Sequence, residues 1–247
     1  MRKSFDELTI ADDYMFYRVM EDTDICKTLL NRVLQGKVET ITDIELQKTI
    51  DDAGRAKGVR FDVWAKDCSG HIYDIEMQAL DKKDLAKRIR YYQAAIDVSL
   101  LGKSKPYESL PDTFILFFCC FDHLEKDMPV YTFKTICSED KTIVLPDGVT
   151  KVIINSAAAY KETDPELKAF LEYMNGIMCD RPFIRKIDRY IKELKENEER
   201  RQEYMLLNLV EMDARKDGIQ QGLQQGLQQK ALQDACNLKR LGVSVDI

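Results

Sequence analysis

The sequence predicts an α/β domain with a mixed β-sheet between helices, followed by an α-helical C-terminal extension. Up to about residue 160, segments of strand length are mixed with amphipathic helices, as in a three-layer domain. Within this part, the continuous apolar run at 113–121 is typical of a central strand that is covered on both faces. Beyond it the apolar residues recur only at helical spacing. We therefore expect a domain at 1–160 and a helical extension at 161–247.

The individual elements follow from local patterns. Apolar residues recur at three- and four-residue steps between Thr9 and Leu34, which predicts helix, with Asp24 capping a second helical piece. Period-two and apolar segments predict strands at 41–47, 59–66, 71–78 and 113–121, with weaker strands at 129–137 and 151–158. Further helices are expected at 81–101, 165–180 and 182–212.

The tail carries a four-residue repeat, "GIQQGLQQGLQQ", at 218–229. Each glycine costs about 1 kcal/mol relative to alanine in a helix, so an isolated helix would be marginal. Glycines spaced by four residues also form a flat stripe that another helix can approach closely. Two interpretations stay open: a frayed, partly disordered tail, or a helix through which the chain self-associates.

Composition excludes several classes of protein. The net charge of −6 argues against attraction of nucleic acid to the whole surface, although it allows a local basic strip. The start has no uncharged apolar run, and no segment has the roughly 18 apolar residues that a membrane span needs, so we expect a cytoplasmic protein that does not bind membranes. The seven cysteines form no C-x-x-C pair, which predicts reduced thiols. His71 and His123 belong to no spaced cluster and are interpreted as bystanders.

Residues 59–78 read as a hairpin around "DCSG". In its second strand Asp74, Glu76 and Gln78 occupy every second position, so all three leave one face of the sheet, as a solvent face or as a site. A two-residue turn would set Asp62 opposite Ile75. A three-residue connection, with Gly70 in the left-handed conformation, would set Asp62 opposite Glu76 and is favoured by that glycine.

Opposed carboxylates repel each other unless a positive charge lies between them. Asp62 and Glu76 would suit Mg²⁺, or the similar Mn²⁺, because Mg²⁺ prefers oxygen ligands. Such an ion can polarise a phosphodiester, lower the pKa of a water and stabilise the leaving oxygen. Gln78, one strand step along, could orient the attacking water or contact a phosphate. The alternative is an edge hairpin with one solvated face.

The helix expected at 81–101 begins with a basic strip. Positive side chains beside aromatic residues can hold a phosphate backbone and stack on exposed bases. Lys83, Lys87 and Arg90 would share one helix face, with Arg88 and Tyr91 on the adjacent face. The alternative is a solvated face that pairs with nearby aspartates. With Arg60 of the hairpin, the candidate nucleic-acid contacts are Arg60, Lys83, Lys87, Arg88, Arg90, Tyr91 and Gln93.

The segment "RFDVWAKDCSGHIYDIEMQ", followed by "KRIRYYQAAID", resembles the recombination-promoting nuclease or putative transposase family of the PD-(D/E)XK nuclease superfamily. The resemblance extends from "ADDYMFYRVM" through "FILFFCCFD" to the glycine-repeat tail. It implies a restriction-endonuclease-like core and metal-dependent cleavage of DNA in recombination, transposition or defence. It matches Asp62 and Glu76 to the metal-binding acids and Gln78 to a position that is lysine in the wider superfamily.

The resemblance also matches Asp13 to an aspartate of the family's "D-x-x-F-K" block that assists the metal site, although Tyr17 stands where that block has lysine. The main hypothesis is a Mg²⁺-dependent DNA endonuclease that forms homo-oligomers through its C-terminal helices. The second is a catalytically inactive protein that uses the same fold to bind nucleic acid or to assemble.

Overall fold

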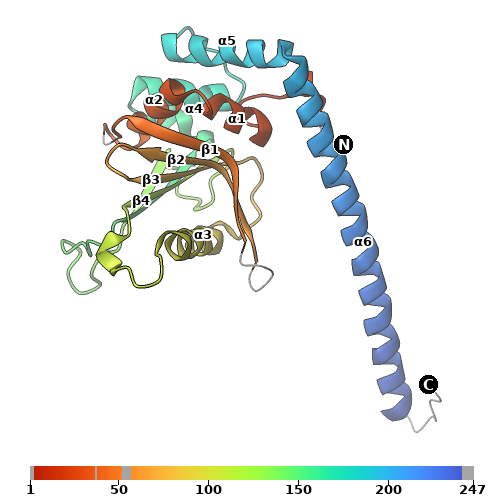
Figure 1. Cartoon of the computed structure of the whole chain (residues 1–247). Coiled ribbons are helices and arrows are strands. Elements are labelled where there is room, and N and C mark those ends of the chain that lie inside the picture. The colour runs from red at the N-terminus through yellow and green to blue at the C-terminus, as the bar shows by residue number, and fades with distance from the viewer. Residues whose placement is uncertain (1–2, 37, 52–56, 241–247) are drawn as a thin grey trace. The chain divides into compact units, whose positions relative to one another are not determined.

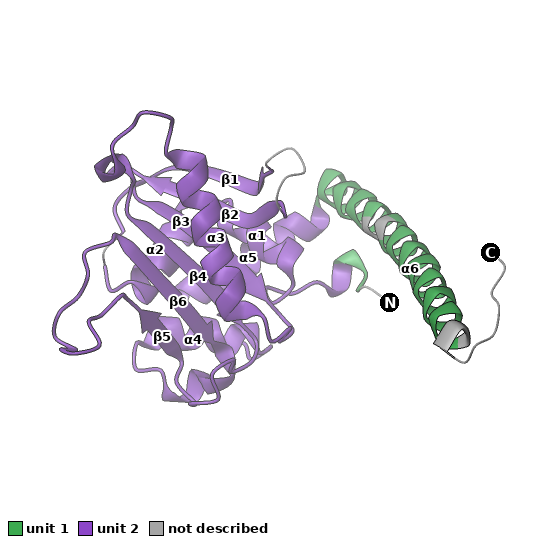
Figure 2. Ribbon diagram, turned by 90° about the horizontal axis from the view of Figure 1, so that it is seen from below, with its two compact units in different colours: residues 1–5, 197–247 green, residues 6–196 purple. Residues whose placement is uncertain are grey.

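A computed structural model describes residues 3–36, 38–51 and 57–240 of the 247-residue chain. The chain divides into two compact units, one formed by residues 6–196 and the other by residues 1–5 with 197–247 (Figure 2). The helices between 165 and 196, which the sequence analysis placed with the extension, lie in the same unit as the sheet.

The larger unit is built on a six-stranded mixed sheet in the order β1-β2-β3-β4-β6-β5. The neighbours β3, β4 and β6 run parallel to one another, whereas the β1–β2, β2–β3 and β5–β6 pairs are antiparallel. As the continuous apolar run predicted, β4 lies inside the sheet. The strands are β1 (Ile41–Ile50), β2 (Val59–Asp67), β3 (Ile72–Gln78), β4 (Thr113–Cys119), β5 (Val130–Phe133) and β6 (Val149–Asn155).

Helices cover both faces of the sheet, with α1, α2, α4 and α5 on one face and α3 on the other (Figure 1). This three-layer arrangement confirms the restriction-endonuclease-like α/β fold. The helices are α1 (Asp13–Met20), α2 (Thr23–Val33), α3 (Leu85–Leu100), α4 (Pro165–Met174), α5 (Pro182–Glu196) and α6 (Glu198–Arg240), with short 3-10 turns η1 (Phe5–Glu7), η2 (Tyr107–Ser109) and η3 (Ser156–Lys161).

Side-chain caps fix where two of these helices begin. The carboxylate of Asp164 accepts hydrogen bonds from the backbone N–H groups of the first turn of α4, and proline follows it at the first helical position. The cap of α2 is Asp22, whose Oδ1 accepts the N–H of Ile25 at 2.8 Å. The prediction that Asp24 caps this helix is wrong, because Asp24 already lies in the first turn of α2.

Each face of the sheet has its own aromatic core. On the face of α1 and α4, the ring of Phe118 lies 5.4 Å from that of Phe16 and 5.7 Å from that of Phe170. On the face of α3, the ring of Tyr92 lies 5.2 Å from that of Phe61 and 6.1 Å from that of Phe117. Such aromatic pairs add stability beyond their buried area, and here they lock α3 over β2, β3 and β4.

The β2–β3 hairpin has the predicted three-residue register. Trp64 is opposite Asp74, and the N–H of Asp67 bonds to the carbonyl of His71 at 3.2 Å. Gly70 has φ +89°, the left-handed conformation that favours glycine. The Asp67 carboxylate accepts hydrogen bonds from the hydroxyl of Tyr73 and from the His71 ring, so it holds the turn together.

In the smaller unit, α6 is continuous through the glycine repeat at 218–229. The backbone of the described residues therefore supports a helical tail rather than a frayed one. The ring of Phe5 packs 5.6 Å from that of Tyr204, whose hydroxyl donates to the carbonyl of Lys3. Across the described parts of both units, we find no helix that combines the length and apolar character needed to cross a membrane.

Candidate active site

The three polar side chains of β3 are buried beneath α3. The exposed fractions are 0% for Asp74, 3% for Glu76 and 8% for Gln78. The alternative interpretation, an edge hairpin with a solvated face, is wrong, because β1 pairs outside β2 and α3 covers the sheet at this point. Buried carboxyl groups are costly, so this face resembles a site more than a surface.

Asp62 and Glu76 meet at the point where backbone pairing between β2 and β3 ends. The paired residues run from Lys66 opposite Ile72 to Val63 opposite Ile75. One step further, Glu76 Oε1 accepts the N–H of Asp62 at 2.8 Å. In turn Asp62 Oδ2 accepts the N–H of Met77 at 3.2 Å. The two carboxylates therefore lie close together. At the end of the hairpin where backbone pairing stops, they accept hydrogen bonds from backbone N–H groups, as carbonyl oxygens do in the paired part.

Burial raises the pKa of each of these acids, and the charge of a neighbouring aspartate adds to the rise. Burial raises the pKa of Asp62 to about 6, the hydrogen bond from Met77 opposes this rise, and the charge of Asp13 adds to it. Burial, followed by the charges of Asp62 and Asp74, raises the pKa of Glu76 well above its ordinary value. Perturbed carboxyl groups of this kind mark a candidate functional site.

Asp74 belongs to the same group, and the sequence analysis did not choose it as a site residue. Neither of its carboxylate oxygens has a hydrogen-bond partner among the described residues, and burial raises its pKa well above the ordinary value. The alternation of polar residues in β3 was a signal for it, because Asp74 shares a face with Glu76. A buried carboxyl group without a donor needs a proton or a cation.

The group offers only oxygen ligands, which is the chemistry that Mg²⁺ and Mn²⁺ prefer. In the described residues no three His, Cys, Asp or Glu side chains are already gathered as ligands. Asp62 and Glu76 instead bind backbone N–H groups, and Asp74 has two unsatisfied oxygens. The donor set therefore fits a hard divalent cation, which would take carboxylate oxygens from these N–H groups.

Gln47 is a second residue that the sequence did not reveal. It lies in β1 opposite β2 and has φ +53°, a left-handed conformation that is unusual for a non-glycine residue within a strand. Its side-chain amide donates to Asp62 Oδ1 at 3.3 Å. Strained backbone is common at functional sites, and here it aims an amide at the acid pair. Nothing in the segment "ITDIELQ" signals this conformation.

The other residues predicted for the acid site lie at its rim. Asp13 is the first residue of α1, and its exposed carboxylate accepts the N–H of Tyr14 at 2.8 Å. Its charge acts on Asp62, which places it near the pair. Gln78 lies on the same face as Glu76, but its amide donates to the carbonyl of Leu80 at 2.5 Å.

The predicted basic strip divides into exposed and internal residues. Arg60, Lys87 and Arg90 are exposed. Arg88 points inward, and its side chain is 20% exposed. Lys83 precedes α3, so it does not share a helix face with Lys87. Its ammonium lies 2.7 Å from a carboxylate oxygen of Asp81.

The two uncharged residues of the strip, Tyr91 and Gln93, form hydrogen bonds within the protein. The hydroxyl of Tyr91 donates to the carbonyl of Lys57 at 2.6 Å, although its ring is 39% exposed. Gln93 is buried, where it donates to Asp97 and accepts from Thr113. Gln93 therefore ties α3 to β4 and does not face solvent.

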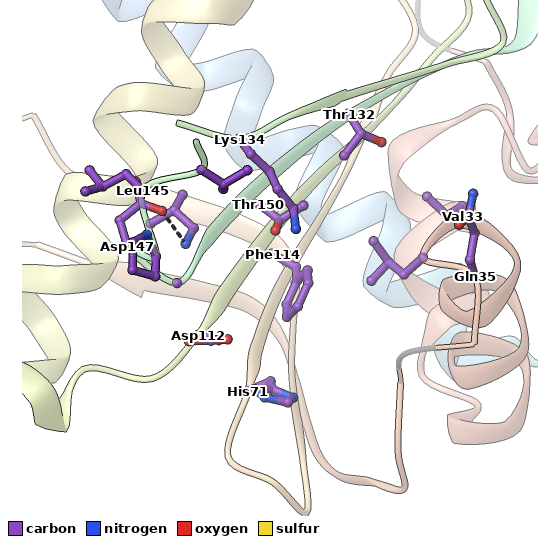
Figure 3. Close-up of a pocket in the computed structure, with 15 residues that line it drawn as sticks. Val33, Gln35, His71, Asp112, Phe114, Thr132, Lys134, Leu145, Asp147 and Thr150 are labelled. Carbon is purple, nitrogen blue, oxygen red and sulfur yellow. Dashed lines mark hydrogen bonds between the residues drawn. The ribbon is translucent and has the colours of Figure 1, made fainter. Parts of the chain in front are cut away.

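Two cavities lie away from the acids. A cavity of about 710 Å³ is lined by His71, Asp112, Phe114, Lys134 and Thr150, on the side of the sheet where β5 and β6 lie (Figure 3). A second cavity of about 650 Å³ lies between α2 and the start of α4. Neither contains Asp62 or Glu76, so we assign the candidate site from the chemistry of its side chains and not from cavity size.

Comparison with known proteins identifies the family of the chain. The profile of the family described as PD-(D/E)XK nuclease family transposase matches residues 11–222 of this chain. No curated protein and no solved structure matches. The matched region contains the whole sheet, the acid group and α3, and it extends into the glycine repeat of α6. The chain therefore belongs to the PD-(D/E)XK nuclease family transposases.

Proposed function

We propose that the chain is a divalent-metal-dependent DNA endonuclease that hydrolyses phosphodiester bonds. The observation that carries the proposal is the close pair of the half-buried Asp62 and the buried Glu76, beside Asp74 where β2 and β3 separate. We place its activity in the cytoplasm, in recombination, transposition or defence. All seven cysteines are free, which is typical of proteins from a reducing compartment.

Asp62, Glu76 and, at the rim, Asp13 would hold the cation, which we take to be Mg²⁺ or Mn²⁺. When bound, it would polarise the phosphodiester, lower the pKa of a water and stabilise the leaving oxygen. Asp62 and Glu76 must be ionised for this role, and burial opposes their ionisation by raising the pKa of each. Gln78 would orient the attacking water once its amide leaves the Leu80 carbonyl.

DNA would lie across the exposed start of α3. Lys87 and Arg90 are exposed there, and the charge of Arg60 acts on Asp62 and so lies near the acids. Positive side chains supply affinity for the phosphate backbone without reading sequence. The contacts would position a phosphodiester over the acids, and specificity for a base sequence is not part of the proposal.

Cleavage of supercoiled plasmid by purified protein tests the proposal. We expect nicking or linearisation only with Mg²⁺ or Mn²⁺, and its loss in Glu76→Gln, which keeps the shape of the side chain. Glu108→Gln, at an exposed site, is the matched control. Cutting in the presence of EDTA, or full activity of Glu76→Gln, would contradict the assignment.

A specific observation favours a second candidate, a catalytically inactive DNA-binding protein on the same fold. The carboxylates of Asp62 and Glu76 already accept backbone N–H groups, and Gln78 already donates to a carbonyl. Calorimetric titration with Mn²⁺ distinguishes the two candidates. The nuclease should bind the ion saturably, and Asp62→Asn should abolish this binding, whereas the inactive protein should show none.

We further propose that α6 binds a second copy of α6. Its apolar side chains Ile219, Leu223 and Leu227 recur every four residues beside the glycine row and are each more than 60% exposed. The segment between Gly218 and Gln229 has no charged residue, so two such helices would not repel each other there. Light scattering after gel filtration should show an oligomer that Leu223→Glu converts to a monomer. A monomeric wild type would contradict the proposal.

A further inference from the structure

Arg88 is the one basic residue of the predicted strip on α3 that turns toward the acids. One guanidinium nitrogen, Nη2, lies 3.7 Å from Glu76 Oε2. The guanidinium carbon lies 4.7 Å from the ring centroid of Phe117 and 5.6 Å from that of Tyr92. These two rings come from β4 and from α3 itself, so the arginine is held between the helix and the sheet.

The contacts leave the guanidinium with donors to spare. A distance of 3.7 Å exceeds the 2.7–2.9 Å of a strong charge-assisted hydrogen bond, so Glu76 does not saturate it. Its Nε is buried and has no partner among the described residues. A buried donor of this kind costs free energy unless another group accepts from it in a different state of the site.

The acid site has a corresponding need for a positively charged side chain. Gln78 is uncharged, so the Glu-x-Gln segment brings no positive charge to the acids. Its amide is also bonded to the Leu80 carbonyl. Arg60 and Lys87 are exposed and can meet the flanking phosphates, whereas Arg88 lies at the depth of Glu76.

We infer that Arg88 is a catalytic residue of the proposed nuclease, whose guanidinium donates to the scissile phosphate beside Glu76. In hydrolysis the water oxygen bonds to phosphorus while the bond to the leaving oxygen breaks. One proton leaves the water, and one reaches the leaving oxygen. Charge builds on the phosphate oxygens during this step, and a fixed guanidinium stabilises it. The inference rests on the proposed function, and it assigns to Arg88 the positive charge that Gln78 does not supply.

Steady-state cleavage of a labelled duplex with saturating Mg²⁺, measured as kcat and KM, tests the inference. Arg88→Met keeps an unbranched side chain against Phe117 and removes the charge. We expect its kcat to fall about 100-fold while KM stays within roughly twofold. Arg88→Lys should recover about tenfold and keep a loss of about tenfold, because it restores the charge but not the planar fork of guanidinium donors. Lys87→Met should show the opposite pattern, with KM raised and kcat unchanged. Arg185→Met, at an exposed position on α5, is the control.

Each outcome decides the matter. A raised KM with unchanged kcat in Arg88→Met would make Arg88 an ordinary phosphate contact and overturn the inference, as would wild-type values of both constants. Thermal unfolding shows whether Arg88→Met folds. If it does not, Arg88→Lys decides, and wild-type kcat in that variant overturns the inference while a tenfold loss supports it. An inactive wild type overturns the proposed function and this inference together, whereas an active wild type with a fully active Arg88→Met overturns this one alone.

Discussion

Replacing Asp62 with asparagine should stabilise the metal-free protein at neutral pH. Asp62 is partly buried next to Glu76 and within reach of the charge of Asp13. Its folded-state pKa is raised above that of the unfolded chain. The variant keeps the shape of the side chain and removes the ionisation, so it isolates the electrostatic cost of placing a carboxylate in this position.

The magnitude follows from the shift in pKa, from 3.8 to about 6. At about 1.4 kcal/mol per unit this corresponds to roughly 3 kcal/mol, which solvent screening of a partly exposed group reduces to about 1–2 kcal/mol. Below pH 3.8 both states hold the proton, and the cost is absent. Between pH 3.8 and about 6 the unfolded chain ionises more readily, so wild type loses stability as the pH rises, and Asp62→Asn does not.

Urea unfolding in EDTA at pH values from 4 to 8 measures this difference. Loss of an acceptor for Gln47 should cost about 1 kcal/mol at every pH, so the test is the growth of the difference between pH 4 and pH 7. Asp180→Asn, at a position whose side chain is 85% exposed, should show no such growth. A difference between Asp62→Asn and wild type that stays constant with pH would refute the reasoning. With Mg²⁺ at about 100 times its Kd, wild type should gain about 2.7 kcal/mol and the variant nothing.

Three further predictions concern the cap, the turn and the basic strip. Asp22→Ala should lower the free energy of unfolding by about 1 kcal/mol through loss of the cap on α2, whereas Asp24→Ala should change it by less than about 0.5 kcal/mol in the same urea titration. Gly70→Ala should cost about 1–2 kcal/mol from backbone strain alone, because no described heavy atom outside Gly70 and its two chain neighbours lies within 4 Å of the added Cβ, and a crowded structure of the variant would contradict this. Lys87→Gln should weaken DNA binding and lower the slope of log K against log salt by about 1, measured by fluorescence anisotropy, and an unchanged slope would remove Lys87 from the interface.

The hairpin was predictable because its geometry follows from local rules. Alternation puts Asp74 and Glu76 on one face, and Gly70 at the third position of the connection fixes the register. Together these two rules set Trp64 opposite Asp74, which the structure confirms. The central position of β4 was predictable for a similar reason, since a strand without polar residues has to be covered on both faces.

Other features depend on contacts between segments far apart in the sequence. The burial of Asp74 requires α3 to lie over β3, and the side chain of Gln47 reaches Asp62 from a left-handed backbone position within β1. The inward turn of Arg88 depends on the rings of Phe117 and Tyr92, whereas helical spacing alone grouped it with the exposed basic residues. Periodicity predicts which face of its own helix a residue occupies. It does not predict how deeply other elements bury that residue.

The acid group links the proposed metal-binding role to the stability of the metal-free protein. Burial raises the pKa of Asp62, Asp74 and Glu76, and the charge of Asp62 raises the pKa of the other two further, so the metal-free protein carries an electrostatic cost at neutral pH. Apolar residues of the same size would remove this cost, as replacing buried ionic groups often does. A divalent cation removes it as well and turns the cost into binding affinity. A chain that keeps three acids under α3 without using a cation would therefore lose stability without gain.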